Sequence, residues 1–136
     1  MRLIHLGDLH LGKFVLEVSM LEEQRAFLRY LADYAAANAV DAVLLAGDIY
    51  DRSVPPAEAV QVLDEFWCAL HRAGIPVLAV PGNHDSPERL AFGSRLFASE
   101  GIHMAGPYDG TLPVVELRDA YLIRSNRESG LGRYDV

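Results

Sequence analysis

Cysteine is almost absent from this chain, since Cys68 is the single one among 136 residues. A lone cysteine cannot form a disulfide within its own chain, and it fits a reducing compartment. We expect it to be a small buried side chain in a helix. Long apolar runs are absent as well, because no stretch approaches the roughly 18 residues that a membrane-spanning helix needs. The N-terminus carries no charged-then-apolar signal segment. These absences predict a soluble, cytoplasmic protein that has no membrane partner.

Basic side chains are scarce. The chain has 12 Lys and Arg against 19 Asp and Glu, which gives a formal net charge of −7. A protein that grips DNA through a broad basic face would show the opposite balance. The composition therefore argues against non-specific DNA binding by this chain alone. It leaves a phosphodiester substrate open, because bound metal ions would locally reverse the sign of an acidic site.

The length and the 51% hydrophobic content suit one domain with a core of its own. Internal repeats, low-complexity tracts and interdomain linkers are absent. Short apolar runs alternate with helical patterns along the chain. We expect strands at residues 1–6, 43–46, 75–80, 102–105 and 112–117, and a loop at 11–18. We expect helices from residue 19 to about 38, from 55 to 74, and from 86 to near 101.

Each expected helix begins at residues that favour a helix N-terminus. These signals are the capping box of Ser19 with Glu22, then Pro55 with Pro56, then Ser86 with Pro87. Gly74 ends the second helix. Apolar residues at helical spacing mark the faces that we expect to be buried. They are Phe27, Leu28, Leu31 and Ala35 in the first helix, Val60, Leu63, Trp67 and Leu70 in the second, and Leu90, Leu96 and Phe97 in the third.

Alternating strands and helices predict an α/β fold with a mainly parallel sheet and covering helices. The run at 43–46 is continuously apolar, so we expect that strand to be buried on both faces. Right-handed crossovers would bring the carboxyl ends of the strands to one edge of the sheet. Ligands of such sheets bind at that edge, where the loops leave the strands.

Three polar phrases stand where the first three of these strands end. They read D-x-H, G-D and G-N-H-D, and their metal-type donors are Asp8, His10, Asp48, Asn83 and His84. Oxygen and nitrogen donors of these kinds suit hard or borderline divalent ions. Any one phrase alone would be ordinary turn sequence. Three of them at one sheet edge predict a two-metal phosphoesterase site.

Two divalent ions about 3.5–4 Å apart can hold both the attacking and the leaving oxygen of a phosphodiester. Such a pair needs a shared carboxylate, and Asp48 is the candidate bridge. Asp8 and His10 would bind one ion together if the segment is extended, because residues two apart then project to one side. Asn83 offers a neutral carbonyl oxygen to the other ion. His84 would donate a proton to the leaving oxygen or stabilise the charge of the phosphorane.

The residues that flank these motifs make the pattern more specific. The extended motifs are DLHLG at 8–12, GDIYD at 47–51 with two prolines shortly after it, and GNHDS at 82–86. This set resembles the calcineurin-like metallophosphoesterase superfamily, and within it the SbcD-like DNA nuclease subunits, over residues 1–120. The resemblance implies the N-terminal part of a metallophosphoesterase sandwich. It also implies a metal-dependent exonuclease or endonuclease that belongs to a complex for DNA repair and recombination.

The resemblance also implies roles and partners. It implies that Asp8 and His10 bind one metal, that Asp48 bridges the two metals, that Asn83 binds the second metal and that His84 assists catalysis. It implies that two further carboxylates shape the site without binding metal, namely Asp51 and Asp85. The metals would be two divalent ions, manganese first and magnesium as the alternative. The partners would be DNA, an SbcC-like ATPase subunit in the full-length family protein, and a second copy bound through the helices at 56–73 and 86–99.

The pattern of the family is incomplete in this chain. Family members carry an isolated histidine and a G-H-x-H phrase further downstream, and this sequence has neither. The other histidines, which are His5, His71 and His103, are expected to be strand or surface residues. We therefore expect a truncated metallophosphoesterase domain at 1–120, holding only the first half of the dinuclear site, and a loose divergent tail at 121–136. Such a chain would bind manganese weakly and have little or no nuclease activity.

Two other functions remain open. One is a phosphomonoesterase or cyclic-nucleotide phosphodiesterase, since Asp51-Arg52 resembles the D-R of protein phosphatases, in which the arginine holds phosphate. There the next residue is Gly, whereas here it is Ser53. The other is an inactive fragment that acts only as an assembly module, through the helices at 56–73 and 86–99. Packing of those helices on their own sheet would also explain most of their apolar residues.

Overall fold

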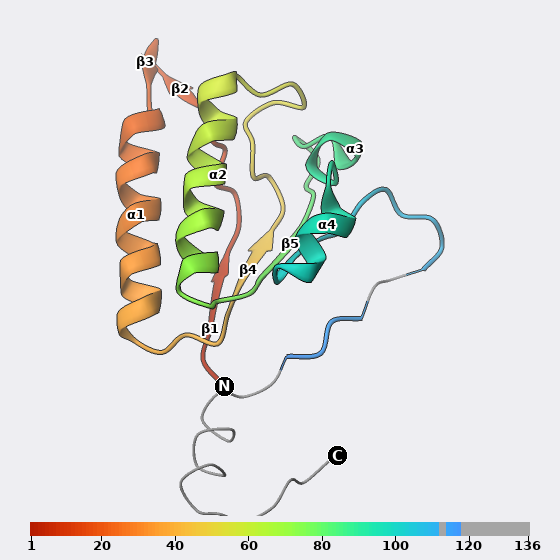
Figure 1. The fold of residues 1–136 in the computed structure, drawn as a ribbon. Coiled ribbons are helices and arrows are strands. Elements are labelled where there is room, and N and C mark those ends of the chain that lie inside the picture. The colour runs from red at the N-terminus through yellow and green to blue at the C-terminus, as the bar shows by residue number, and fades with distance from the viewer. Residues whose placement is uncertain (112–113, 118–136) are drawn as a thin grey trace, which may run out of the picture.

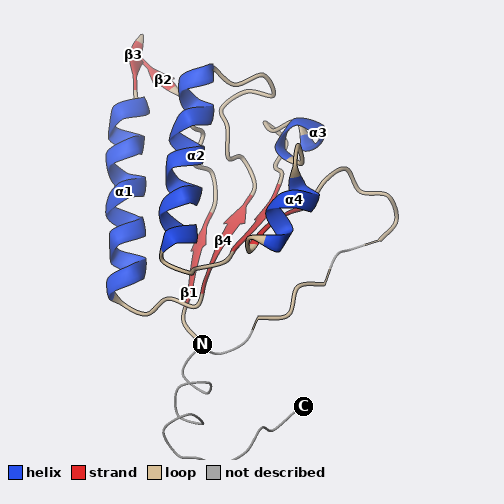
Figure 2. Ribbon diagram, viewed as in Figure 1, coloured by secondary structure: helices blue, strands red, loops and turns tan. Residues whose placement is uncertain are grey.

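Four parallel strands form the sheet on which the molecule is built (Figure 2). The computed structural model describes residues 1–111 and 114–117. In their order across the sheet, the strands are β1 (Leu3–Leu6), β4 (Ala42–Ala46), β5 (Val77–Val80) and β6 (Ile102–Met104). The expected α/β architecture with a parallel sheet is confirmed. Because the strands that carry the three polar phrases are neighbours, their carboxyl ends lie side by side.

Two long helices cover one face of this sheet, as Figure 1 shows. They are α1 (Leu21–Ala37) and α2 (Ala57–Arg72), which pack against each other. The core between helices and sheet includes Leu28 of α1, Leu63 of α2 and Val43 of β4. Burial of such side chains stabilises the fold by about 1.5–3 kcal/mol each. The layer holds the strand ends, and therefore the polar loops, in fixed positions.

The opposite face of the sheet is partly open in the part of the chain that the structure describes. In β4, Val43 and Leu45 are buried, whereas Leu44 is half-buried and Ala46 is exposed. A groove of about 510 Å³ runs over this face, and Leu44, Leu78 and His103 line it. The expectation that this strand is buried on both faces is therefore wrong, because helices α1 and α2 cover only one of them.

A β-hairpin occupies part of the segment for which the sequence predicts a loop. Its strands are β2 (Phe14–Val15) and β3 (Val18–Ser19), joined by Leu16 and Glu17, which have φ values of 49° and 65°. Two successive residues with positive φ are typical of a type I′ turn. The sequence lacks the Asn-Gly or Asp-Gly pair that normally signals this turn, so the local pattern does not predict the hairpin.

The capping box at the start of α1 is also wrong. Ser19 belongs to β3, and the N-cap is Met20, which makes no side-chain cap. The Ser19 hydroxyl instead accepts a long hydrogen bond of 3.4 Å from the Leu21 amide. The hairpin uses Ser19 as a strand residue, so the helix begins two residues later than expected. Its buried face includes Leu28 and Ala35 as expected, but Phe27 is 47% exposed.

Helix α2 begins after Pro56, its N-cap, close to the expected start. Its buried residues are Ala59, Val62, Leu63, Phe66 and Leu70. Burial of Leu63 and Leu70 is as expected, whereas Val60 is exposed and Trp67 is only partly buried. Cys68 is half-buried as well. The buried stripe of α2 is therefore rotated about one residue from the expected one, because α2 packs on α1 as well as covering the sheet.

The third expected helix is two short helices, α3 (Pro87–Leu90) and α4 (Ser94–Ser99). Ser86 caps α3 as expected, with its hydroxyl accepting from the Arg89 amide. Gly93 has a φ of 73° and breaks the helix, since this left-handed conformation cannot continue an α-helix. Leu90 is buried as expected, but Leu96 is 76% exposed. The ring of Phe97 lies 6.4 Å from that of Trp67, which links α4 to α2.

The last expected strand is not formed in the part of it that the structure describes. Residues 114–117 belong to no strand, and residues 112–113 lie outside the described residues. The tail at 121–136 and the expected domain boundary near residue 120 lie outside them too.

Candidate metal centre

The three polar phrases meet at one edge of the sheet. Asp8 and His10 follow β1, Asp48 follows β4, and Asn83 and His84 follow β5. The strands are in register there, with Leu6 beside Leu45 and Ala46 beside Val80. This is the arrangement that the parallel sheet predicts.

The loops after β1 and β4 continue to pair beyond the strands. The main-chain amides of Asp8, His10 and Leu11 donate to the carbonyl groups of Gly47, Asp48 and Ile49, at 3.2, 2.9 and 2.9 Å. The Asp51 amide returns a bond to the Leu11 carbonyl. Two loops that are bonded in this way move together, so the positions of Asp48 and His10 are coupled.

Strained backbone marks the predicted ligands. Asp8, His10 and Asp48 have φ values of 54°, 46° and 48°, all in the left-handed region. This conformation costs a residue other than glycine on the order of 1–3 kcal/mol and is enriched at functional sites. The segment between Asp8 and His10 is therefore not extended as expected. The two side chains still approach each other, with His10 Nε2 4.0 Å from Asp8 Oδ1.

Gly82 allows the third loop to approach the second. A Cβ atom at this position would overlap the carboxylate and the main-chain nitrogen of Asp48. Because Gly82 has no side chain, Asp48 comes close enough for the His84 amide to donate a hydrogen bond to its Oδ1 at 2.9 Å. A glycine is thus required here for space.

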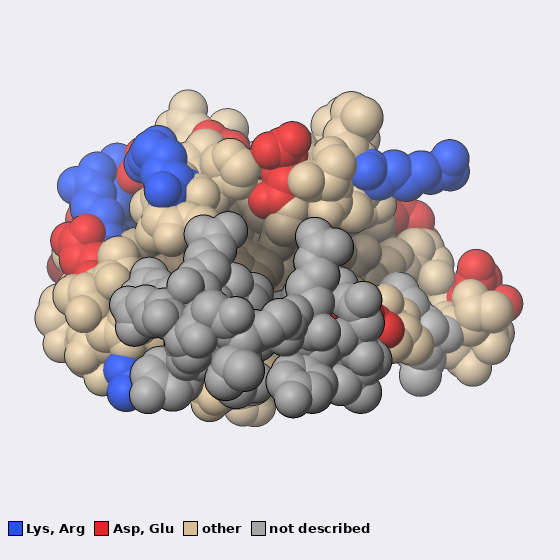
Figure 3. Space-filling model, turned by 60° about the horizontal axis from the view of Figure 1, so that its bottom comes forward, with Lys and Arg blue, Asp and Glu red and all other residues tan. Residues whose placement is uncertain are grey.

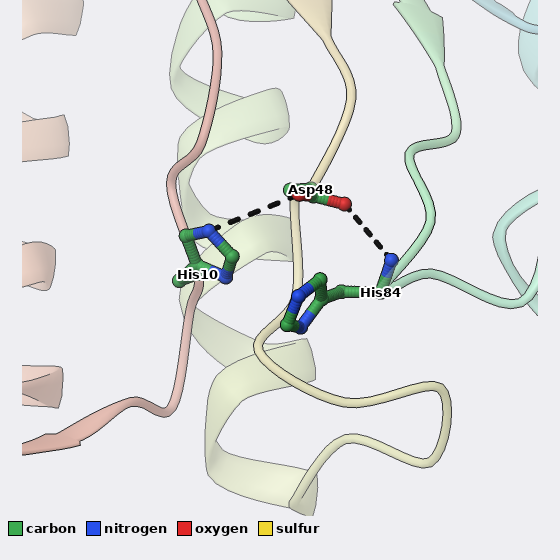
Figure 4. A group of neighbouring side chains, drawn as sticks. All are labelled: His10, Asp48 and His84. Carbon is green, nitrogen blue, oxygen red and sulfur yellow. Dashed lines mark hydrogen bonds and ion pairs between the residues drawn. The ribbon is translucent and has the colours of Figure 1, made fainter.

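His10, Asp48 and His84 converge on one point, as Figure 4 shows. Their potential ligand atoms all lie within 4.8 Å of one another. His10 Nε2 is 3.9 Å from Asp48 Oδ2. The rings of His10 and His84 meet edge to face, with centroids 4.8 Å apart. The sequence pattern counts His84 among the metal-type donors and gives it a catalytic role, and the folded loops bring its ring next to His10 and Asp48.

The Nδ1 atom of His10 is buried and has no hydrogen-bond partner among the described residues. Asp51 Oδ1 lies 3.6 Å from it, beyond normal hydrogen-bond length. Asp48 is buried too, at 9% exposure, and no Lys or Arg pairs with it among the described ion pairs. Buried polar and charged groups normally have partners or coordinate metals. The donor set therefore fits a divalent cation.

The other predicted residues lie differently. The Asp8 side chain is 81% exposed and faces solvent at the rim of the site. Asn83 is exposed as well. Both follow the same strand ends as the three converging residues, so they are close in the fold without belonging to the tight cluster.

Asp85 is not part of the converging cluster, and its carboxylate holds the loops together. Its Oδ2 accepts from the amides of Gly82 and Ile49 at 2.8 and 3.1 Å, and its Oδ1 accepts from Tyr50 at 2.8 Å. All of these groups are buried or partly buried. Burial, and then the negative charge of Asp85 and Asp64, raises the pKa of Tyr50 to about 12.

The ring of His84 is oriented by the main chain. Its Nδ1–H donates to the Asp51 carbonyl at 3.0 Å, because a carbonyl oxygen can only accept. That bond is the largest cause that raises the pKa of His84 above its usual value. Desolvation opposes it, and the nearby carboxylates of Asp48, Asp51 and Asp85 each raise the pKa by less. A histidine held in this way retains its proton more readily than a free one.

No helix in the described residues is long and apolar enough to cross a membrane.

Comparison with known proteins is consistent with this geometry. The model of the family described as calcineurin-like phosphoesterase matches residues 1–131. Three curated relatives are each named as the SbcD subunit of the nuclease SbcCD. The protein of Bacillus subtilis is 40% identical over 115 residues, which cover 84% of this chain and 29% of the relative. The protein of Staphylococcus epidermidis is 32% identical over 118 residues, which cover 86% of this chain and 32% of the relative.

The third relative, from Staphylococcus saprophyticus, is 38% identical over 105 residues, which cover 76% of this chain and 27% of the relative. The chain therefore spans less than a third of the length of these relatives, and the resemblance to SbcD-like nuclease subunits covers that part. Since the family model matches residues 1–131 of the 136, the chain belongs to the calcineurin-like phosphoesterase family.

Proposed function

We propose that this chain forms the first half of the dinuclear centre of an SbcD-like, metal-dependent DNA nuclease. The observation that carries the proposal is the convergence of His10, Asp48 and His84, whose potential ligand atoms all lie within 4.8 Å of one another. Similarity to three relatives named as subunits of the nuclease SbcCD supports the reaction class. Manganese is the proposed metal, with magnesium as the alternative, and a cytoplasmic location is part of the same proposal.

In this proposal Asp48 is the shared carboxylate, Asp8 and His10 hold one ion, and Asn83 holds the other. Divalent ions supply Lewis acidity to the phosphodiester and lower the pKa of a bound water. The residues of the chain position the substrate around them. Asp85 holds the loops after β4 and β5 together through three amides. Asp51 orients the His84 ring through its carbonyl group.

His84 is the proposed proton donor to the leaving oxygen. Its Nδ1–H is engaged by Asp51, so Nε2 is the nitrogen that can exchange a proton with the substrate. The raised pKa increases the fraction of rings that carry the proton, which suits a general acid. The same cluster geometry also admits His84 as a ligand, and metal titration of a His84 variant separates the two roles.

The chain alone is expected to bind manganese weakly. Mn²⁺ and Mg²⁺ favour six oxygen-rich ligands each, and the described residues offer five candidate donors for two ions. Isothermal titration of the chain with MnCl₂ would measure this. We expect weak binding that Asp48→Asn reduces further. His84→Ala should leave the affinity unchanged if His84 is the proton donor, and should lower it if His84 is a ligand. Equal affinity of the wild type and Asp48→Asn would contradict the proposed bridge.

Nuclease activity is best tested in a longer protein. Residues 1–117 of this chain can replace the matching segment of the Bacillus subtilis relative, of which the match covers 29%. We expect the chimera to cleave linear duplex DNA in the presence of manganese, and Asp48→Asn in the chimera to abolish cleavage. A chimera that folds and binds manganese but does not cleave DNA would overturn the nuclease proposal.

A phosphomonoesterase or cyclic-nucleotide phosphodiesterase is the second candidate. It is favoured by Arg52, whose exposed guanidinium stands beside the site with its Nε 3.9 Å from Asp51 Oδ2. An arginine there could hold a terminal phosphate. The chimera decides between the candidates, because hydrolysis of para-nitrophenyl phosphate without cleavage of DNA would favour the phosphomonoesterase.

Assembly is the remaining part of the proposal. The full-length protein would pair with an SbcC-like ATPase subunit, and two copies would associate through the helices at 56–73 and 86–99. Exposed apolar side chains on these segments support the dimer, notably Val60, Phe92 and Leu96. A strictly monomeric chain in sedimentation would remove the dimer proposal.

A further inference from the structure

A glutamine in the first turn of α1, Gln24, forms hydrogen bonds with the loop that carries His10. The Nε2 atom of Gln24 donates to the carbonyl groups of Leu9 and His10, at 2.8 and 2.9 Å. Its Oε1 accepts from the Gly12 amide at 3.1 Å. One side chain thus makes three hydrogen bonds within a four-residue stretch of the loop, and the group is partly buried. None of the motifs in the sequence includes this residue.

The loop that Gln24 contacts, residues 9–12, contains residues with positive φ values. His10 has a left-handed φ of 46°, a conformation that needs support from its surroundings. The loop after β4 holds one side of it through the His10 amide, which donates to the Asp48 carbonyl. On the other side, Gly12 lies against Pro56 and Ala59, where a Cβ atom would come within 3.3 Å of both. Gln24 contacts the same loop from a third side, that of α1.

Two of the three groups that Gln24 binds have no substitute for it among the described contacts. The His10 carbonyl also accepts from the Lys13 amide at 3.0 Å, so it would keep one bond. The Leu9 carbonyl and the Gly12 amide have Gln24 as their one partner in the described part of the chain. A buried or partly buried main-chain group that loses its partner costs about 1–3 kcal/mol. The loop would therefore rearrange rather than keep its conformation without Gln24.

We propose that Gln24 is a positioning residue that aims the His10 ring at Asp48 and His84. It fixes the peptide groups on both sides of His10, and the ring direction follows from them. The part of the inference that concerns metal affinity rests on the proposed function. The part that concerns the ring position does not, so the two can fail separately.

The first test needs no metal. Side-chain NMR of the imidazole groups reports the surroundings of each histidine, and we expect the edge-to-face contact of His10 with His84 to displace the signals of both rings. In Gln24→Met, which keeps the length of the side chain and removes its hydrogen bonds, we expect the signals of His10 and His84 to move. The exposed His71 should keep its signal. Unchanged His10 signals in a folded variant would overturn the proposal.

The second test measures the dissociation constant for Mn²⁺ by titration. Residues that orient metal ligands typically contribute about 10–100-fold to affinity, and we expect a loss of about tenfold in Gln24→Met. Gln24→Glu is the discriminating variant, since it keeps the acceptor for Gly12 but has no donor for the two carbonyl groups. A purely electrostatic effect of the added negative charge would strengthen cation binding, whereas loss of positioning weakens it.

Gln61→Met is the matched control, because Gln61 is exposed on α2 and outside the site. We expect it to bind Mn²⁺ like the wild type. Wild-type affinity in both Gln24 variants, together with displaced ring signals, would overturn the link to the metal. Absence of Mn²⁺ binding by the wild type would count against the proposed function, and the ring signals would still decide whether Gln24 positions His10. If Gln24→Met does not fold, Gln24→Glu serves both measurements.

Discussion

At the scale of single residues, the site depends on a buried carboxylate outside the cluster of converging donors. Asp85 is 6% exposed and accepts three main-chain hydrogen bonds from two loops. Three amides aimed at one carboxylate make an anion-binding arrangement, in which charge-assisted bonds are stronger than neutral ones. Its function is therefore to join the loops after β4 and β5, so that Asp48 and His84 keep their distance.

We expect Asp85→Asn to destabilise the protein by about 1–3 kcal/mol. The amide that replaces one carboxylate oxygen cannot accept, so at least one buried N–H group loses its partner. The midpoint of urea unfolding measures the change. Asp33→Asn is the control, since Asp33 is exposed on α1, and it should unfold like the wild type. Equal stability of the two variants would contradict the role of Asp85.

Tyr50 gives a prediction in alkaline solution. Its pKa is raised to about 12 by burial and by Asp85 and Asp64, above the value near 10 that it has in an unfolded chain. Between these values the folded state keeps a proton that the unfolded state has lost. The stability contributed by the neutral phenol is therefore fully present below pH 10 and decreases as the pH rises toward 12.

The prediction is checked by urea unfolding of the wild type and of Tyr50→Phe across that pH range. The wild type should lose more stability than the phenylalanine variant, which has no group to ionise. Parallel curves for the two proteins would show that Tyr50 does not carry the effect.

At the scale of elements, the close approach of two loops decides the site. The loops after β4 and β5 come together because position 82 has no side chain. Its φ is not in the left-handed region, so the requirement is one of space alone. Sequence spacing identifies the phrase around Gly82, but the contact with Asp48 exists only once β4 and β5 are paired.

We expect Gly82→Ala to lower stability by about 1–3 kcal/mol, as overpacking does, and to weaken Mn²⁺ binding as well, because Asp48 must move. Gly74→Ala is the control. It has a positive φ of 70° and open space around it, so the strained backbone alone should cost about 1–2 kcal/mol. That variant should bind Mn²⁺ like the wild type. Unchanged metal affinity in Gly82→Ala would contradict the coupling of the loops.

The buried stripe of α2 gives another prediction for an element. Phe66 is 3% exposed, whereas Val60 is 44% exposed. Phe66→Ala should cost about 3–5 kcal/mol, the usual range for a buried aromatic side chain. Val60→Ala should stay within about 0.5 kcal/mol. Thermal or urea unfolding measures both. A larger loss of stability in Val60→Ala would mean that Val60 is buried, and hence that α2 has a different rotation on the sheet from the one described.

At the scale of the whole molecule, charge limits how DNA can be held. The net charge is −7. On the face seen in Figure 3, basic side chains stand apart from one another with acidic ones between them, and they form no broad basic patch among the described residues. If the proposed function holds, DNA would be recruited at the candidate metal centre and by other parts of a longer protein, since the relatives extend well beyond this chain.

We expect the chain without metal to bind duplex DNA with a dissociation constant weaker than about 10⁻⁴ M at physiological salt, the weak end of non-specific binding. Fluorescence anisotropy of a labelled duplex measures this, and added Mn²⁺ should strengthen it. Tight binding without metal would show that a basic surface outside the view of Figure 3 outweighs the net charge.

Local signals in the sequence account for most of the elements, but not for their ends or faces. The apolar runs around Val43 and Val77 and the prolines before α2 are local, so they indicate their elements directly. The hairpin around Leu16 has no such signal, because its turn lacks the usual glycine. Gly93 is a weak local signal, since a glycine within a helical pattern can be tolerated or can break the helix. Val60 and Phe66 show that the sequence does not determine which face of α2 is buried. Two adjacent apolar stripes are possible, and packing on α1 and the sheet decides between them.

The sequence by itself determined the family, the parallel sheet and the residues at the strand ends, because motif wording and the order of strands and helices are properties of the chain alone. It also named Asp8, His10, Asp48, Asn83 and His84 as the candidate ligands and proton donor. Tertiary structure decided which of them converge. His10, Asp48 and His84 meet because β1, β4 and β5 are neighbours, because Gly82 admits Asp48, and because Gln24 reaches from α1 to the His10 loop. Those contacts join residues far apart in the chain, and such distances are set only when the sheet and its helices pack.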